Sequence, residues 1–266
     1  MQIAVASWSL HREIPKLTPL IEFPRICQEE FGVKAVELNS PFFASTEVGY
    51  LDELKETLSE RGMKLVNIPV DLGNIANPDD EKREKDLEAL KEWFSIAKRM
   101  GSPFVRINAG KGEPTDDAML RRVIGSYKEL VEEGEKVGVD LVIENHGGPS
   151  ANPDNIVRII ETVGSTHFGA CPDFGNFAPE IRYQGIAKIA KYAFLAHVKS
   201  YDFDEEGKET TIDVERCLNI LKDSGFDGYL SIEFEGKGNQ REGVKKTLAL
   251  LKKLAHSSSI ERTTRW

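Results

Sequence analysis

The amino-acid sequence predicts an α/β protein, a single-domain (β/α)8 barrel, and three observations lead to this fold class. Eight short apolar runs alternate along the chain with longer stretches of helical periodicity. Strands separated by helices form βαβ units with a parallel sheet, and eight such units fit a chain of 266 residues. The chain contains no linker rich in Pro, Gly or Ser and no break in composition. An open doubly wound sheet is the alternative, but no GxGxxG motif or phosphate-binding glycine cluster follows a strand.

The expected strands are short apolar runs at residues 3–7, 35–39, 64–70, 104–108, 141–145, 167–171, 194–200 and 229–235. The clearest helical stretches between them are 79–101, 117–138 and 212–226. The first of these begins with acidic residues and ends with basic residues and Gly101, which suits the helix dipole and a C-terminal cap. We expect the barrel domain to span residues 1–256. The polar stretch 257–266 is expected to be a frayed end or an oligomer contact.

Composition and charge indicate the compartment and the class of ligand. With 40% hydrophobic residues the chain can bury a substantial core. It lacks both the pattern of a signal peptide and an apolar run of about 18 residues, so no membrane partner is expected. Cys27, Cys171 and Cys217 are far apart and form no CxxC pair, which favours a reduced, cytoplasmic protein. A net charge of -9 argues against nucleic acid and favours a small soluble ligand.

Polar side chains end four consecutive strands in the second half of the chain. The segment LVIENHGG (141–148) passes directly from three branched aliphatic residues to Glu144, Asn145 and His146. The next three strands deliver further polar residues at or near their ends, namely Asp173, Asn176, His197, Lys199, Glu233 and Glu235. Active sites of (β/α)8 barrels lie at the carboxyl ends of the strands, and these residues recur about once per βα unit. We therefore expect them to share one rim of the barrel.

Four of these residues form a set that suits a metal ion: Glu144, Asp173, His197 and Glu233. Three carboxylates and one imidazole favour a hard or borderline divalent ion such as Mn²⁺, Mg²⁺ or Co²⁺. Without a cation, converging carboxylates would repel one another and be driven to take up protons. Oxygen-rich ligation also leaves coordination positions open for substrate oxygens. The sequence therefore predicts one catalytic divalent metal.

The segments LVIENHGG, CPDFGNF, LAHVKSYDF and GYLSIEFEG resemble the motifs of the xylose isomerase-like TIM barrel superfamily. Within it, the chain is most similar to the sugar phosphate isomerase/epimerase family, and the resemblance covers essentially the whole sequence. It implies that Glu144, Asp173, His197 and Glu233 bind the metal. It also implies proton transfer next to the carbonyl of a keto or aldo sugar through an enediolate, with Glu144 and Glu233 as the proton-transferring pair. The family often dimerises, so the resemblance allows a homo-oligomer as well as a monomer, and the sequence leaves the oligomeric state open.

The sequence departs from the ketose 3-epimerases of that family at three positions, where Ser150, Asn176 and Phe203 replace a Glu, a His and an Arg. The family also contains lyases, dehydratases and deglycosidases that act on keto sugars, keto inositols and 3-keto glycosides. His146 is a candidate base for such an elimination, so this reading is the alternative to isomerisation. A barrel that only binds a ligand is a third reading. The endonuclease branch needs a His-rich trinuclear zinc site, whereas only His146 and His197 stand at strand ends here.

Other polar or aromatic residues at strand ends are candidates for binding the sugar. Trp8 is a candidate for stacking on a sugar face, and Arg106 and Asn108 are candidates for binding hydroxyl groups. Lys199 shares a face with His197 and is expected either to contact substrate or to pair with an acid such as Glu235. The predicted substrate-binding set is Trp8, Arg106, Asn108, Asn176 and Lys199.

Overall fold

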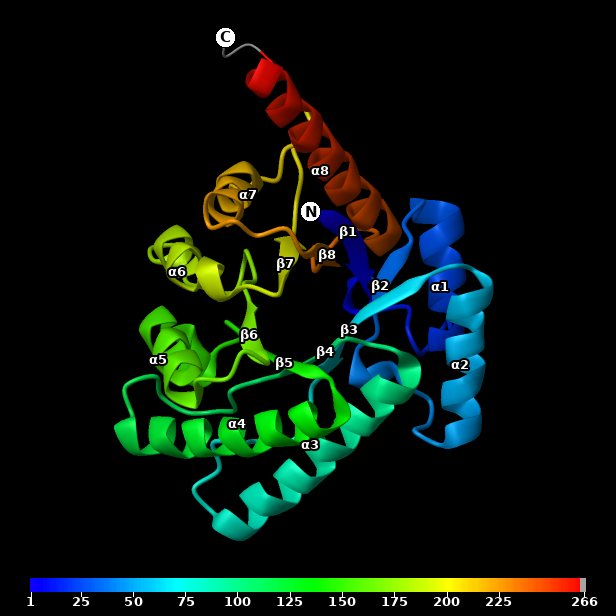
Figure 1. Ribbon diagram of the computed structural model, residues 1–266. Coiled ribbons are helices and arrows are strands. Elements are labelled where there is room, and N and C mark those ends of the chain that lie inside the picture. Colours follow the sequence, from blue (N-terminus) through cyan, green and yellow to red (C-terminus); the bar gives the residue numbers. More distant parts are fainter. Residues whose placement is uncertain (264–266) are drawn as a thin grey trace.

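The computed structural model describes the backbone of residues 1–263 and the side chains of residues 1–255. Eight parallel strands form one sheet in the order β6-β5-β4-β3-β2-β1-β8-β7. Their bounds are β1 (Gln2–Ala6), β2 (Ala35–Glu37), β3 (Lys64–Val70), β4 (Phe104–Ile107), β5 (Asp140–Glu144), β6 (Phe168–Cys171), β7 (Leu195–Ser200) and β8 (Tyr229–Phe234). An isolated parallel bridge between Ala170 and Ala193 joins β6 to the segment just before β7 and closes the barrel. The predicted (β/α)8 barrel is confirmed (Figure 1).

Helices ring the outside of the barrel (Figure 1). They are α1 (Phe23–Ile26), which continues as the π-helical turn η3 (Cys27–Phe31), α2 (Val48–Glu60), α3 (Asp80–Met100), α4 (Asp117–Val137), α5 (Pro153–Val163), α6 (Arg182–Ile189), α7 (Val214–Asp223) and α8 (Gln240–Thr263). Short 3-10 turns occur at η1 (Ser7–Leu10), η2 (Leu20–Glu22), η4 (Ser40–Phe42), η5 (Gly148–Ala151) and η6 (Ala190–Tyr192). Each strand is followed by helix, as the alternating sequence pattern predicts.

Caps and glycines set the ends of the two longest barrel helices before α8. The Asp79 carboxylate accepts a hydrogen bond from Lys82 N at 3.2 Å and begins α3, and Asp116 caps α4 in the same way. Gly101 and Gly138 follow these helices with φ of 79° and 75°. Glycine adopts this left-handed conformation without a Cβ clash, so the helix stops there. The three helices expected from the sequence are found, the last as the shorter α7.

Packing between helices and strands fixes the strand ends that carry the polar residues. Phe94 of α3 and Tyr127 of α4 are fully buried. The Tyr127 hydroxyl donates to the carbonyl oxygen of Ile107, the last residue of β4, at 2.8 Å. A buried hydroxyl needs such a partner, because an unpaired one costs about 1–3 kcal/mol. The hydrogen bond therefore holds the end of β4 against α4, directly before Asn108.

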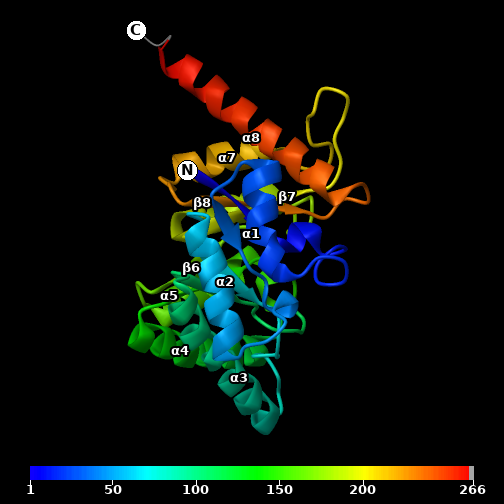
Figure 2. The same cartoon turned by 90° about the vertical axis from the view of Figure 1, so that its right-hand side faces the viewer.

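Helix α8 projects beyond the body of the barrel (Figure 2). Because it runs back antiparallel to β8, its projecting end lies opposite the carboxyl ends of the strands. Within the described part of the chain, no helix combines the length and the apolarity needed to cross a membrane. The backbone of α8 extends into the stretch 257–266, whose side chains lie outside the described residues. The boundary at 256 and the role of that stretch remain predictions.

Candidate metal centre

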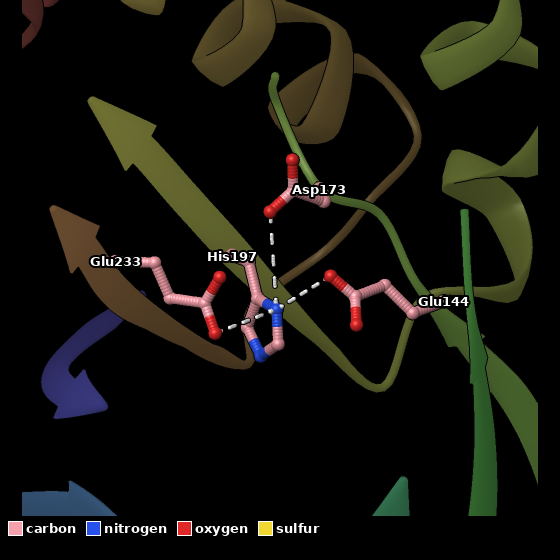
Figure 3. A group of neighbouring side chains, drawn as sticks. All are labelled: Glu144, Asp173, His197 and Glu233. Carbon is pink, nitrogen blue, oxygen red and sulfur yellow. Dashed lines mark hydrogen bonds and ion pairs between the residues drawn. The ribbon is translucent and has the colours of Figure 1, made fainter. Parts of the chain in front are cut away.

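Four side chains from the last four strands converge inside the carboxyl end of the barrel. Glu144 ends β5, Asp173 follows β6, His197 lies in β7 and Glu233 in β8. Each offers one ligand atom, and these atoms all lie within 4.8 Å of one another (Figure 3). His197 Nδ1 lies 3.0 Å from Glu144 Oε1, 3.5 Å from Glu233 Oε1 and 3.9 Å from Asp173 Oδ2. The four residues predicted to bind one metal are thus brought together.

Hydrogen bonds around Asp173 orient its carboxylate toward this cluster. Asp173 N donates to Asn145 Oδ1 at 2.7 Å, and Asn145 Nδ2 donates to Asp173 O at 3.0 Å. This reciprocal pair ties the end of β5 to the chain that follows β6. Asp173 Oδ1 accepts from the backbone N–H groups of Gly175 and Asn176 at 2.7 and 2.8 Å. The other oxygen, Oδ2, therefore faces Lys199 and His197.

The cluster fits a divalent cation by its donor set and by its unsatisfied oxygens. Among the residues whose side chains are described, Glu144 Oε2 and Asp173 Oδ2 are buried without a hydrogen-bond partner. Glu144 Oε2 lies 3.0 Å from Arg106 Nε, close enough for an ion pair but not aligned as a hydrogen bond. Buried carboxylate oxygens are normally paired or bound to a metal. The three carboxylates and one imidazole are the ligand set that Mn²⁺, Mg²⁺ and Co²⁺ accept.

The charges of the cluster shift the pKa values of its members in different directions. Burial raises the pKa of Asp173 to about 7, and the neighbouring Glu144 and Glu233 add to this although Lys199 opposes it. Burial also opposes the ionisation of Glu144, but His197 and Arg106 outweigh it, so its pKa lies well below the usual range. A divalent ion would offset the repulsion between these buried carboxylates.

Glu37, at the end of β2, orients the imidazole of His197. His197 Nε2 lies 3.0 Å from Glu37 Oε2, and because a carboxylate only accepts, the ring nitrogen donates. Asn67 Nδ2 donates to the same oxygen at 3.3 Å. The arrangement leaves Nδ1 facing the three carboxylates. The contact between Glu37 and His197 joins β2 to β7 and has no sequence signal.

Replacing Glu37 by glutamine is expected to lower the affinity for divalent metal about 10- to 100-fold, because the carboxylate that orients the ligand imidazole and increases its basicity is lost. A chelating dye competing for Mn²⁺ or Co²⁺ measures this affinity. Glu53→Gln, on the exposed face of α2, is the matched control and should leave it unchanged. Equal affinities in both variants would show that Glu37 does not act through His197.

A cavity of about 600 Å³ opens above the cluster at the carboxyl ends of the strands. Seven predicted site residues line it: Trp8, Arg106, Asn108, Glu144, His146, Lys199 and Glu233. Further lining residues include Asn39, Asp71, Lys111 and Glu235, of which Asp71 carries no sequence signal of its own. Asn176 is not one of the described residues that line this cavity. Its side-chain amide donates to Glu144 Oε1 at 3.1 Å, so its predicted contact with substrate stays a prediction.

Trp8, Glu235 and Lys199 form one hydrogen-bonded wall of the cavity. Trp8 Nε1 donates to Glu235 Oε1 at 2.7 Å, and Lys199 Nζ lies 3.0 Å from the same oxygen. The Trp8 ring also stacks with His11 and Phe42, at centroid distances of 5.4 and 5.6 Å. The expected pairing of Lys199 with Glu235 is found. Stacking of Trp8 on a sugar remains a prediction.

The loop after β5 carries His146 and is held by close backbone contacts. His146 N donates to Ser150 Oγ at 3.0 Å, so Ser150 braces the loop. Gly148 has φ +52°, and a Cβ there would lie 2.3 Å from the carbonyl oxygen of Gly110 in the loop after β4. The two loops therefore approach each other more closely than any other residue at position 148 would allow.

Gly148→Ala is expected to destabilise the protein by about 1–3 kcal/mol, because alanine is strained at positive φ and its Cβ would collide with backbone. Urea unfolding measures the change. Gly125→Ala is the matched control: it lies within α4, where a Cβ meets no atom within 4 Å, so it should be neutral or stabilise by up to about 1 kcal/mol. Equal effects of the two substitutions would rule out the backbone clash.

Curated relatives of the chain include deglycosidase subunits and epimerases. The C-glycoside deglycosidase alpha subunit of Arthrobacter globiformis is 38% identical over 65 residues, covering 24% of this chain and 18% of that subunit. The corresponding subunit of Microbacterium trichothecenolyticum is 26% identical over 161 residues, covering 56% and 42%. The matches therefore span less than half of either subunit. An L-ribulose-5-phosphate 3-epimerase of Escherichia coli is 24% identical over 221 residues, covering 69% and 75%.

Solved structures share the whole barrel. An L-ribulose 3-epimerase superposes with a TM-score of 0.81 at 16% identity, covering 98% of this chain and 97% of the epimerase. A xylose isomerase-like TIM barrel protein of Mycobacterium smegmatis in complex with magnesium has a TM-score of 0.70 at 18% identity, covering 95% and 97%. The IOLI protein with a bound zinc atom has 0.75 at 17%, covering 96% of each chain. At these identities the likeness shows the fold alone.

The family follows from the sequence match together with the barrel. The family model described as xylose isomerase-like TIM barrel matches residues 28–254, which is most of the chain. The matched region contains all four residues of the metal-site cluster and the strands β2 to β8. The protein belongs to the xylose isomerase-like TIM barrel family.

Proposed function

We propose that the protein is a divalent-metal-dependent sugar isomerase or epimerase that transfers a proton next to the carbonyl of a keto or aldo sugar. The observation that carries this proposal is the buried Glu144, Asp173, His197 and Glu233 cluster beside the cavity, with ligand atoms within 4.8 Å. The epimerase among the curated relatives and the family itself support it. Mn²⁺, Mg²⁺ and Co²⁺ are the proposed ions, and the magnesium and zinc of two solved relatives support a divalent metal.

A divalent ion held by the four residues would polarise the carbonyl group and acidify the neighbouring carbon. Glu144 and Glu233 both line the cavity and approach it from different strands. The pKa of each is lowered although burial opposes this, because His197 and a nearby basic residue favour the ionised form. One ionised glutamate accepts the proton from carbon to give an enediolate. The other glutamate, once it has taken up a proton from solvent, would return that proton to the opposite face or to the adjacent carbon.

Solvent isotope exchange tests this proposal. The Mn²⁺-, Mg²⁺- or Co²⁺-loaded protein is incubated in D₂O with a panel of ketoses and aldoses, and the products are separated by chromatography and analysed by mass spectrometry. We expect a product isomeric with its substrate that carries one solvent deuterium. Products that lack water or an aglycone would instead identify elimination, and the absence of any conversion would favour a barrel that only binds a ligand.

A metal-dependent lyase, dehydratase or deglycosidase is the second candidate, favoured by His146. This exposed imidazole lines the cavity two residues beyond Glu144, and two curated relatives are deglycosidase subunits. His146 would then remove the proton whose loss expels a hydroxyl group or the aglycone. Incubation with inosose and with 3-keto glucosides separates the candidates, because His146→Ala should abolish release of water or aglycone but spare exchange that depends on the two glutamates.

A further inference from the structure

Asp71 is a cavity residue that neither the metal cluster nor the proton transfer uses. It directly follows β3 (Lys64–Val70), and its backbone N–H donates to Ser40 Oγ at 3.0 Å. Its side chain is 23% exposed and lines the same cavity as Glu144 and Glu233. It therefore stands on the wall made by β3 and β4, while Lys199 and Glu235 stand on the wall made by β7 and β8.

Two donors hold a single oxygen of this carboxylate. Arg106 Nη1 donates to Asp71 Oδ1 at 2.5 Å, and Asn108 Nδ2 donates to the same oxygen at 3.0 Å. Within the described residues, no hydrogen bond reaches Asp71 Oδ2. Asn108 Oδ1 is buried and also has no partner among them. The wall therefore carries two acceptor oxygens, one charged and one neutral, that the described residues leave without a donor.

The charge balance shows what kind of partner suits these oxygens. The Arg106 guanidinium, only 3% exposed, is matched by two carboxylates, those of Asp71 and Glu144. It is therefore not available to an anionic ligand. Acceptor oxygens without a free donor beside them bind groups that bring their own hydrogen, and a sugar hydroxyl does so. If Asp71 were only the counter-ion of Arg106, the buried Asn108 carbonyl would keep an unmet cost of about 1–3 kcal/mol.

We propose that Asp71 and Asn108 form a subsite that binds one or two hydroxyl groups of the sugar, on the cavity wall opposite Lys199 and Glu235. The inference rests on the proposed function in that it takes this cavity to be the sugar site. It assigns Asp71 as a substrate-binding residue that sets which hydroxyl pattern the protein accepts. The reacting carbons of the sugar lie at the metal cluster, and Asp71 binds a hydroxyl group on a more distant carbon of the sugar.

Calorimetric binding to the metal-loaded full chain tests the subsite without relying on turnover. The ligands are D-fructose, D-ribulose and 3-keto-D-glucose, followed by the monodeoxy derivatives of whichever binds. We expect removal of one particular hydroxyl to weaken binding by wild type about 10- to 100-fold, as for a hydrogen bond to a charged group. Asp71→Asn should weaken binding of the parent sugar similarly. In that variant, removal of the same hydroxyl should change the affinity by less than about 3-fold.

Two further variants make the result decisive. Asn108→Ala keeps the Arg106–Asp71 pair but removes both the unpartnered carbonyl and the amide that donates to Asp71, and it should also weaken binding of the parent sugar. Asp52→Asn removes a carboxylate paired with Arg99 on the surface and should change nothing. Deoxygenation costs that are unchanged in Asp71→Asn, or no binding of any of the three sugars, would overturn the subsite. Asp71-dependent binding without deuterium exchange would refute the proposed function alone, and exchange without Asp71 dependence would refute this inference alone.

Discussion

Replacing Glu233 by alanine is expected to remove the bound metal and to lower proton-transfer activity by about 1,000-fold or more. Glu233 is one of the four residues proposed to bind the metal and one of the two glutamates proposed to move the proton. Its Oε1 lies 3.5 Å from His197 Nδ1, on the side of the cluster that faces the cavity. Among the described residues, Glu235 is the one other carboxylate that β8 and the residue after it bring to the cavity. Glu235 is already hydrogen-bonded to Trp8 and Lys199, so it does not replace Glu233.

Elemental analysis of the purified variant gives its metal content, and the D₂O exchange assay gives its activity. Glu233→Gln keeps the size of the side chain and shows whether a loss of metal reflects a lost ligand rather than a disturbed fold. Glu242→Ala is the control, since this exposed residue on α8 pairs only with Lys245 in the described structure. Full metal content together with undiminished exchange in both Glu233 variants would contradict the assigned site.

The fold was predictable because hydrophobic periodicity and helix ends are local signals. Asp79 and Gly101 mark the ends of α3 in the sequence as they do in the structure. The end of β2 was not predictable: the expected strand 35–39 stops at Glu37. The register between β2 and β3 shifts at Val36 and Glu37 there, so the chain leaves the sheet early. That shift depends on the neighbouring strand, and the run AVELN gives no hint of it.

The metal cluster was predictable for a different reason. Its four residues recur about once per βα unit, and the barrel places such positions on one rim. Side-chain contacts between residues of different strands were not predictable in this way. Glu37 reaches His197 over 160 residues of sequence, and Arg106 reaches Asp71 over 35. The partners in these contacts are chosen by side-chain length and direction inside a closed barrel, which composition and spacing do not record.

Lys199→Met is expected to destabilise the metal-free protein by about 3–5 kcal/mol, and to cost less when metal is bound. Lys199 Nζ lies 2.6 Å from Glu233 Oε2, 3.0 Å from Glu235 Oε1 and 3.4 Å from Asp173 Oδ2. The side chain is only 2% exposed, so its ammonium group is the buried counter-charge of these carboxylates. Methionine fills a similar volume but leaves their negative charge uncompensated.

A divalent ion would supply part of the missing charge, because it would share Asp173 and Glu233 with the lysine. Urea unfolding in the presence of a chelator and in saturating Mn²⁺ should therefore show a larger metal-induced gain in stability for Lys199→Met than for wild type. Lys245→Met removes a surface ion pair and should change stability by less than about 1 kcal/mol in both conditions. An equal loss for Lys199→Met with and without metal would mean that no cation shares these carboxylates, and the metal centre would have to be abandoned.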